Sequence, residues 1–533
     1  MRRFLVGMLV CVLFGAWAGV PGSFAASYGP QQTVVIAHDI TDAVTLDPNL
    51  AYELSGTVTD HQLYSNLVTF VRGNLTQPRP QVAQSWDVSP DSRTYTFHLK
   101  HGIVFSGGNP LTADDVVYTF QRVVNLPKDP ASWLITQMGV DDKNVLSAVK
   151  ATDPYTLVVA LPKPFSPGAF LSIMANPVTG IVDSKTVKAH VQNNDWGSNW
   201  LNDHSAGCGP YELVKWERQV TIEIVANPRY NLGSAPSIKR IIFSNIIENT
   251  VQREMLGRGD VDIAWDLSAA QLDALKREAK FYVAQTPDLS MQYLGMDVKN
   301  VPAFGKPAAR QAVKYAIDYD GIIHDLLNGN GLPLQGVIPK GLFGYDPALP
   351  FKHDPAKAKS LLAEAGFPSG FTVELLTGTG AAAGGVSLGD LAAKVKNDLG
   401  AVGIRVNVRQ IASSEMLKTY RAQQAQMVLL GWYVDYPDPD DFAKPFGDYT
   451  QKSLAWRLNY ANDPLAKLVD QAAGMQNTPE RASIYKKVND IEAQDGPFAV
   501  LYQPMISFGV SKRIQNLVFD PVNYIDFLSL TKQ

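Results

Sequence analysis

Alternation of hydrophobic and polar residues gives a clear structural signal near position 95. Tyr95, Phe97 and Leu99 point to one side, and the residues between them are polar, which predicts a half-buried strand. Shorter apolar runs bounded by turn residues predict further strands at 33–37, 156–160, 220–225 and 238–243.

Helical spacing appears in several other segments. Leu63, Leu67 and Phe70 share one face of a helix predicted over 60–70. Thr112 and Asp115 form a capping-box pattern that predicts the start of another helix. Good helix formers with apolar residues at three-to-four spacing predict further helices at 308–317 and 355–365.

The second half of the chain has a strand–helix rhythm. Apolar runs at 371–376, 404–408 and 427–430 predict strands separated by helices. This order implies a mixed or parallel sheet with covered faces, so the fold class is α/β.

Length and charge narrow the class of protein. A chain of 533 residues is too long for one core and predicts about three compact units. Its formal charge of −4, without a long basic run, excludes the electrostatic basis of non-specific nucleic-acid binding.

The first 25 residues have the pattern of a cleavable secretory signal peptide. Arg2 and Arg3 precede an apolar stretch, and small residues follow Pro21-Gly22. Cys11 lies inside the stretch rather than at a lipid-attachment site, so cleavage would leave Cys208 as a single cysteine that cannot pair. We therefore expect an unlipidated protein of a Gram-negative periplasm.

The sequence offers few candidate catalytic features. The chain has no GxxxxGK[ST], HExxH or GxGxxG sequence. Cys208 is a candidate nucleophile, but a buried residue in a Gly-Cys-Gly turn is the favoured interpretation. His98 and His101 would face opposite sides of a strand, which disfavours a shared metal. We expect no catalytic residues, no metal site and no cofactor.

The segment from 429 to 440 carries the strongest candidate for ligand chemistry. A predicted strand ends at Gly431, and Trp432, Tyr433 and Tyr436 then surround Asp435. Ligands bind at strand C-termini in α/β sheets, and a carboxylate among aromatic rings suits a ligand cation. We interpret the nearby Asp438 and Asp440 as structural.

Seven ordered motifs together resemble a known family, the extracytoplasmic solute-binding proteins of peptide/nickel-type ABC importers (family 5). The most specific match is PQVAQSWDVSPDSRTYTFHLKHGIVFSGGNPLTADDVVYTF at 80–120. The others are LDP at 46–48, GCGPY at 207–211 with Trp216, GDVD at 259–262, RQAVKYAID at 310–318, DPAKAKSLLAEAG at 354–366 and GWYVDYPDPD at 431–440.

This resemblance implies a bilobal periplasmic-binding-protein fold of type II, in its large three-subdomain form with two crossover hinge segments. The first lobe would take 33–63, 195–291 and 503–533, with an inserted subdomain at 64–194, and the second lobe would take 292–502. A monomer would close on its ligand and present it to permease subunits that work with a cytoplasmic ATPase.

The resemblance also implies roles for particular residues. Asp435 corresponds to the carboxylate that pairs with a peptide's α-ammonium group. The first-lobe contact corresponds to Tyr52 or Glu53, because the local alignment is ambiguous by one residue.

Three departures from the family pattern bear on the ligand. Tyr433 stands where some members have a disulfide cysteine. Leu429 stands where some members have an arginine that binds the peptide carboxylate, and the loop 378–385 lacks the corresponding arginine of dipeptide binders. A peptide or peptide-like amine is the expected ligand; a metal chelate, an opine, an oligosaccharide, or hydrolysis at Cys208 are the alternatives.

Overall fold

The structure is a computed structural model that describes residues 28–71, 74–126, 130–520, 522 and 524–533. The predicted leader, its cleavage site and Cys11 lie outside these residues. Within the described ranges, no helix combines the length and the apolar character that crossing a membrane requires.

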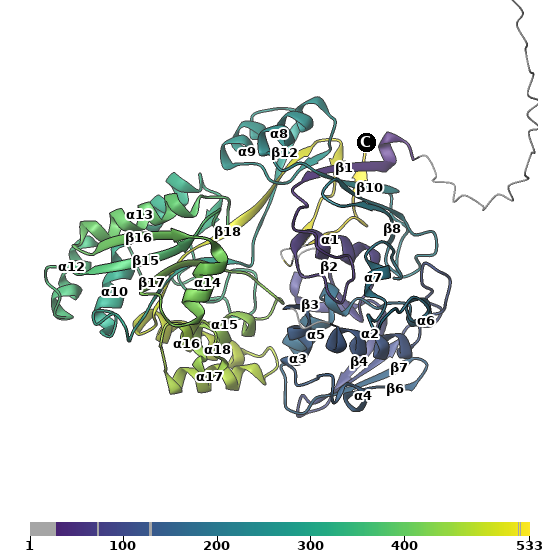
Figure 1. Ribbon diagram of the computed structural model, residues 1–533, viewed down its shortest axis with the longest axis horizontal. Coiled ribbons are helices and arrows are strands. Elements are labelled where there is room, and N and C mark those ends of the chain that lie inside the picture. The colour runs from purple at the N-terminus through teal and green to yellow at the C-terminus, as the bar shows by residue number, and fades with distance from the viewer. Residues whose placement is uncertain (1–27, 72–73, 127–129, 521, 523) are drawn as a thin grey trace, which may run out of the picture.

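Two lobes lie side by side, and extended strands cross between them (Figure 1). The first lobe is built around β1 and the second around β13. The core of the first lobe contains β1 (Thr33–His38), α1 (Leu54–Leu63), β8 (Tyr211–Glu217), β9 (Thr221–Ala226), β10 (Arg240–Asn245), α8 (Asn249–Arg258), β11 (Ile263–Ala264), α9 (Ala269–Lys276) and β12 (Phe281–Pro287).

Between α1 and β8 the chain forms a separate layer with its own four-stranded sheet, in the order β4-β5-β7-β6. Helix α2 packs on β6 and β7. The elements are β2 (Val68–Val71), β3 (Asn74–Pro80), β4 (Ala83–Val88), β5 (Thr94–Leu99), α2 (Ala113–Asn125), α3 (Pro130–Thr136), α4 (Val145–Ala148), β6 (Val149–Asp153), β7 (Thr156–Ala160), α5 (Pro167–Met174), α6 (Ser184–Ala189) and α7 (Ser198–Leu201).

The second lobe has the mixed sheet that the strand–helix rhythm predicts, with β15 parallel to both β16 and β17. Its elements are β13 (Met291–Met296), α10 (Pro307–Ala316), α11 (Tyr319–Gly321), β14 (Gly331–Leu332), α12 (Pro355–Glu364), β15 (Thr372–Gly378), α13 (Leu388–Ala401), β16 (Arg405–Ile411), α14 (Ser413–Arg421), β17 (Met427–Trp432), α15 (Asp440–Gly447), α16 (Leu454–Arg457), α17 (Asp463–Ala473) and α18 (Pro479–Gln494).

Strand β18 (Phe498–Ser511) belongs to both lobes. Its first residues pair with β13, the next two pair with β14, and residues 505–511 pair with β12 and β11 of the first lobe. The chain then stays with the first lobe in β19 (Ile514–Gln515), β20 (Phe519–Asp520), β21 (Tyr524–Ile525) and β22 (Thr531–Lys532). The two lobes are therefore joined by the β12–β13 connection and by β18.

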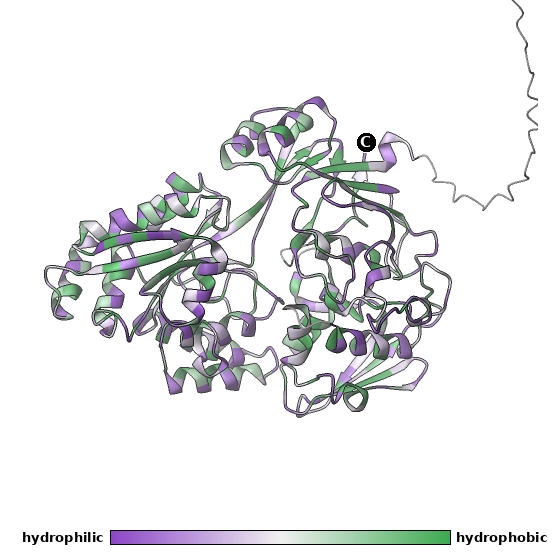
Figure 2. Cartoon of the chain, viewed as in Figure 1, coloured by the Kyte–Doolittle hydropathy of each residue, from purple (hydrophilic) through white to green (hydrophobic). Residues whose placement is uncertain are grey.

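Strands and helices of both lobes carry hydrophobic and polar residues side by side (Figure 2). In β5, Tyr95, Phe97 and Leu99 are almost fully buried, as the alternation predicts. The capping box at α2 is also present, with the Thr112 N–H donating to the Asp115 carboxylate at 2.8 Å. The α/β class and the bilobal fold are thus confirmed, whereas the residue boundaries predicted for the lobes stay predictions.

One predicted helix is wrong beyond its first residues. Helix α1 ends at Leu63, and Phe70 lies in β2, which pairs with β3. Leu67 and Phe70 are buried in a core that also contains β5 residues. Pairing of β2 with a distant partner overrides the local helical spacing.

Candidate functional site

A cavity of about 780 Å³ lies where the two lobes meet. A second cavity of about 340 Å³ adjoins it and shares Tyr52 and Asp435. The larger volume is within the ~300–1,000 Å³ range of small-molecule sites. The larger cavity is lined by Tyr52, Trp133, Gln137, Lys163, Pro164, Phe165, Trp432, Asp435, Tyr436, Asp440, Asp441, Lys444, Pro445, Gln451, Lys452, Ser453, Arg457, Asp470, Ala473 and Gly474.

The segment that follows β17 supplies one wall of the cavity. Asp438 anchors this segment through a buried pair with Arg481, whose two terminal nitrogens donate to the Asp438 oxygens at 2.6 and 2.9 Å. Asp440 pairs with Lys444 at 2.6 Å, one turn later in α15. Both aspartates thus have the structural contacts that the sequence indicates, although Asp440 also lines the cavity.

Asp435 is held by both lobes. Its side chain accepts a hydrogen bond from the Tyr52 hydroxyl of the first lobe. Its backbone carbonyl accepts from the Asn176 amide at 3.0 Å, and its own N–H donates to Asp441 at 2.8 Å. No described lysine or arginine forms an ion pair with Asp435. The carboxylate is therefore fixed in place without a cationic partner.

Three of the four carboxylates that line the cavity, Asp435, Asp440 and Asp441, lie in an environment that disfavours negative charge. Burial raises the pKa of Asp435, although the Tyr52 hydrogen bond opposes the shift. Burial, followed by the charge of Asp435, raises the pKa of Asp441 well above its usual value. Burial also raises the pKa of Asp440, and the positive charge of Lys444 opposes that shift. A ligand cation that enters here would compensate this loss of solvation.

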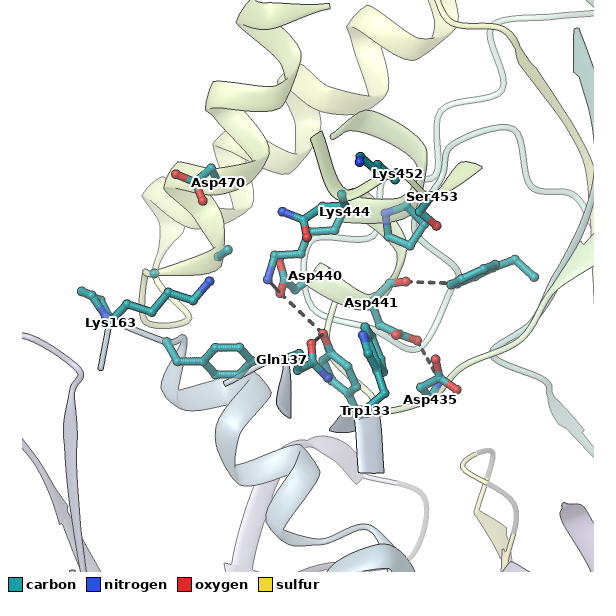
Figure 3. Close-up of a pocket in the computed structure, with 18 of the residues that line it drawn as sticks. Trp133, Gln137, Lys163, Asp435, Asp440, Asp441, Lys444, Lys452, Ser453 and Asp470 are labelled. Carbon is teal, nitrogen blue, oxygen red and sulfur yellow. Dashed lines mark hydrogen bonds and ion pairs between the residues drawn. The ribbon is translucent and has the colours of Figure 1, made fainter. Parts of the chain in front are cut away.

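The first lobe closes the cavity from the opposite side. Trp133 in α3 and the following Gln137 point toward the carboxylates (Figure 3). The Tyr436 hydroxyl donates to Gln137 Oε1 at 3.3 Å. Nearby, the Ser166 N–H donates to the Ala473 carbonyl at 2.8 Å. The described lobes therefore meet directly around the cavity.

The predicted aromatic residues occupy different places. Trp432 lines the larger cavity and donates its indole N–H to the Asp441 carbonyl at 3.0 Å. Tyr436 lines it too but is only 1% exposed. Tyr433 is 58% exposed and lines the smaller cavity. Gly431 lines neither; a Cβ there would lie 3.1 Å from the Tyr433 ring, which indicates a close-packed strand end.

Tyr52 and Glu53, the two candidates for the first-lobe contact, lie in different places. Tyr52 lines both cavities and contacts Asp435. Glu53 immediately precedes α1 and lines neither cavity. Of the two residues, Tyr52 is the one placed to contact a ligand at Asp435.

Sequence reasoning missed several residues of the cavity wall. Trp133 and Gln137 come from a segment almost 300 residues before Asp435, and nothing local marks them. Asp441 extends the acidic run of the Asp-Pro-Asp-Asp stretch, which could have signalled it. Arg457, also missed, is the last residue of α16.

Cys208 is 2% exposed, and burial raises the pKa of its thiol to about 12. A Cβ on either neighbouring glycine would lie within 2.4 Å of a backbone oxygen at 62–63, so the Gly-Cys-Gly turn allows two chain segments to approach closely. A buried structural thiol, rather than a thiolate nucleophile, is what this environment favours.

The chain is similar in sequence to known binding proteins. The profile of the bacterial extracellular solute-binding proteins, family 5 (middle region), matches residues 77–453. A probable D,D-dipeptide-binding periplasmic protein of Escherichia coli is 28% identical, with 92% of each chain covered. A dipeptide-binding protein of Escherichia coli is 27% identical (88% of this chain, 89% of that one), and heme-binding protein A of Haemophilus influenzae is 26% identical (88% and 87%).

Solved structures share the fold. HbpA2 from Haemophilus parasuis superposes with a TM-score of 0.83 at 24% identity, covering 94% of this chain and all of that one. A periplasmic binding protein from Helicobacter pylori in complex with the peptide STSA gives 0.76 at 23% identity, covering 94% and 98%. At these identities the likeness establishes the bilobal architecture.

Proposed function

The chain belongs to the bacterial extracellular solute-binding proteins of family 5, and from that membership we propose that it captures a peptide or peptide-like amine-bearing solute between its lobes for an ABC importer. The family consists of binding proteins rather than enzymes. Relatives described as periplasmic and as dipeptide-binding support this assignment.

One observation carries the proposal. Asp435 lies in the cavity between the lobes, held by Tyr52 and Asn176 but without a cationic partner among the described residues. An ammonium group that bonds to this carboxylate would replace lost solvation with a charge-assisted hydrogen bond. The aromatic rings of Trp432 and Tyr52 would add favourable contacts with the same cation.

Delivery to a membrane permease is part of the proposal. Closure of the lobes on ligand would bring the two halves of the binding-protein surface into the arrangement that permease subunits contact. The mature protein would act in the periplasm after removal of residues 1–25, and the ATPase would work on the cytoplasmic side. N-terminal sequencing of exported protein tests the cleavage after Ala25.

The binding test uses free-amine tetrapeptide libraries and their N-acetylated counterparts, with capture measured by native mass spectrometry. Asp435→Asn should weaken capture of free-amine peptides about tenfold or more, because a charged hydrogen bond is worth ~1.5–3 kcal/mol. Asp142→Asn, an exposed carboxylate outside both cavities, is the matched control and should bind as the unmodified protein does.

Two results would contradict the assignment. Equal capture by the unmodified protein, Asp435→Asn and Asp435→Ala would exclude the ammonium role. A large thermal shift with nickel–histidine, hemin, an opine or an oligosaccharide, and none with peptides, would replace the peptide class. No described histidine, cysteine or methionine lines either cavity, so no observation favours a metal chelate over the peptide.

A further inference from the structure

Arg457 is a half-buried cation that lines the larger cavity and has no anionic partner among the described residues. It is the last residue of α16. None of the ion pairs between described residues includes Arg457, and its buried Nε has no hydrogen-bond partner. A guanidinium in this position lacks the compensation that buried charges normally have.

The surroundings of Arg457 are aromatic rather than acidic. Its guanidinium carbon lies 5.5 Å from the centroid of the Tyr420 ring. Burial lowers the pKa of Arg457; Tyr420 and Tyr293 oppose the shift, and Arg421 adds to it. No carboxylate contributes. The guanidinium therefore lies over an aromatic ring rather than beside a carboxylate.

The other cations that line the cavity already have an anionic partner or contact with solvent. Lys444 pairs with Asp440 at 2.6 Å and lies over the Phe165 ring. Lys163 and Lys452 are exposed, so water solvates their ammonium groups. Among the described cavity residues, Arg457 is therefore the cation that gains most from an added anion.

The cavity lining carries as many acidic as basic side chains, but not all of them are paired. Four carboxylates (Asp435, Asp440, Asp441 and Asp470) and four cations (Lys163, Lys444, Lys452 and Arg457) line it. Asp435 and Arg457 both lack an oppositely charged partner among the described residues. A ligand with one positive and one negative group can satisfy both, whereas a simple amine satisfies only the first.

We propose that Arg457 binds the carboxylate of a zwitterionic ligand whose ammonium group is bound by Asp435. This inference rests on the proposed function and narrows the ligand class to peptides with a free C-terminus or related amino acids. The planar guanidinium can hold a carboxylate through two parallel hydrogen bonds, which a lysine cannot do.

The position of Arg457 also accounts for the two departures noted above. Leu429, at one family arginine position, is fully buried within β17 and belongs to the core of the second lobe. The loop 378–385 has no arginine. The carboxylate-binding group would therefore come from α16 in this chain.

The experiment compares two tetrapeptide libraries of identical composition, one with free C-terminal acids and one with C-terminal amides, both with free amines. Native mass spectrometry measures capture by the unmodified protein and by Arg457→Gln, Arg457→Lys and Arg421→Gln. Arg421 is the matched control. It is an exposed arginine at the end of α14 whose charge acts on Arg457, but it does not line the cavity.

We expect the unmodified protein and Arg421→Gln to prefer free acids by about tenfold or more. Arg457→Gln should lose that preference, and Arg457→Lys should retain part of it. Both Arg457 variants should still prefer free amines over N-acetylated peptides, which shows that they remain folded and that Asp435 still acts.

Three outcomes would overturn the inference. Capture of acids and amides to the same extent by the unmodified protein would keep the proposed function but remove the role of Arg457. An unchanged acid preference in Arg457→Gln would assign the carboxylate to another residue. Capture of neither library would contradict the proposed function itself, and the role of Arg457 with it.

Discussion

Two arginines of the second lobe illustrate opposite uses of a positive charge. Arg481 in α18 is fully buried and is satisfied within the fold, by Asp438 at 2.6 and 2.9 Å and by the Ala472 carbonyl at 3.0 Å. Arg457 in α16 has no ion pair among the described residues and faces a cavity. Arg481 stabilises the framework, whereas the guanidinium of Arg457 has no anionic partner among the described residues.

The carboxylates near them divide in the same way. Asp438 is paired with Arg481, whereas Asp435, three residues earlier, has hydrogen bonds but no cationic partner within the described part of the chain. Buried charges are costly unless they are paired. A pair closed within the protein therefore indicates structure, and an unpaired charge in a cavity indicates a ligand.

The largest expected effect comes from breaking the closed pair. Arg481→Met leaves Asp438 buried without its cation and should destabilise the protein by about 3–5 kcal/mol. Thermal unfolding followed by circular dichroism should show a lower Tm for this variant. Arg457→Met should leave Tm almost unchanged, because no ion pair between described residues is lost.

A double variant checks the cause. Adding Asp438→Leu to Arg481→Met removes the orphaned carboxylate and should recover part of the lost stability. If Arg481→Met and Arg457→Met lowered Tm equally, the distinction between the two arginines would be wrong.

Asp288 extends the comparison to another carboxylate that forms no ion pair with the residues that the structure describes. It lies between β12 and β13, lines the smaller cavity, and accepts a hydrogen bond from Ser290 at 2.7 Å. Burial raises its pKa to about 6. Because the folded state holds this proton more tightly than the unfolded chain, stability contributed by the protonated form is lost as pH rises from about 4 to about 6.

Asp288→Asn should remove this dependence. The variant should gain up to about 3 kcal/mol relative to the unmodified protein between pH 4 and pH 7, since two units of pKa correspond to about that free energy. Urea unfolding at a series of pH values measures the difference. A constant difference across the series would show that burial of Asp288 does not control its titration.

Much of the framework could be predicted from sequence, because local patterns and tertiary packing agree there. The alternation at 94–100, the capping box at Thr112 and the strand–helix rhythm after 371 all correspond to observed elements. The helix predicted over 60–70 failed after Leu63, because pairing of β2 with β3 is a non-local interaction.

The site was less predictable for the same reason. Asp435 is recognisable from the aromatic residues beside it in sequence. Arg457 sits in a four-residue helix, and its importance depends on what does not contact it. An absent partner cannot be seen in a linear pattern, so only the assembled lobes identify this residue.

A smaller effect is expected where the closed pair meets the first lobe. Gly168 in α5 packs so tightly that a Cβ would lie 2.9 Å from Asp438 Oδ2 and 3.0 Å from Asn477 Nδ2. Gly168→Ala should overpack this contact and cost about 1–2 kcal/mol. Small-angle scattering should show a larger radius of gyration if the lobes separate to relieve the contact; an unchanged radius and Tm would contradict tight packing there.

The smallest effect should come from an exposed cation on the same helix as Arg481. Lys486 is within 3.0 Å of Asp346 and 3.3 Å of Asp490, but 59% of its side chain is exposed. Water and salt compensate each partner when such a pair is broken. Lys486→Ala should therefore leave both Tm and peptide capture unchanged within error. A drop in Tm comparable to that of Arg481→Met would mean that pairing itself, rather than burial of the pair, determines which cations the framework requires.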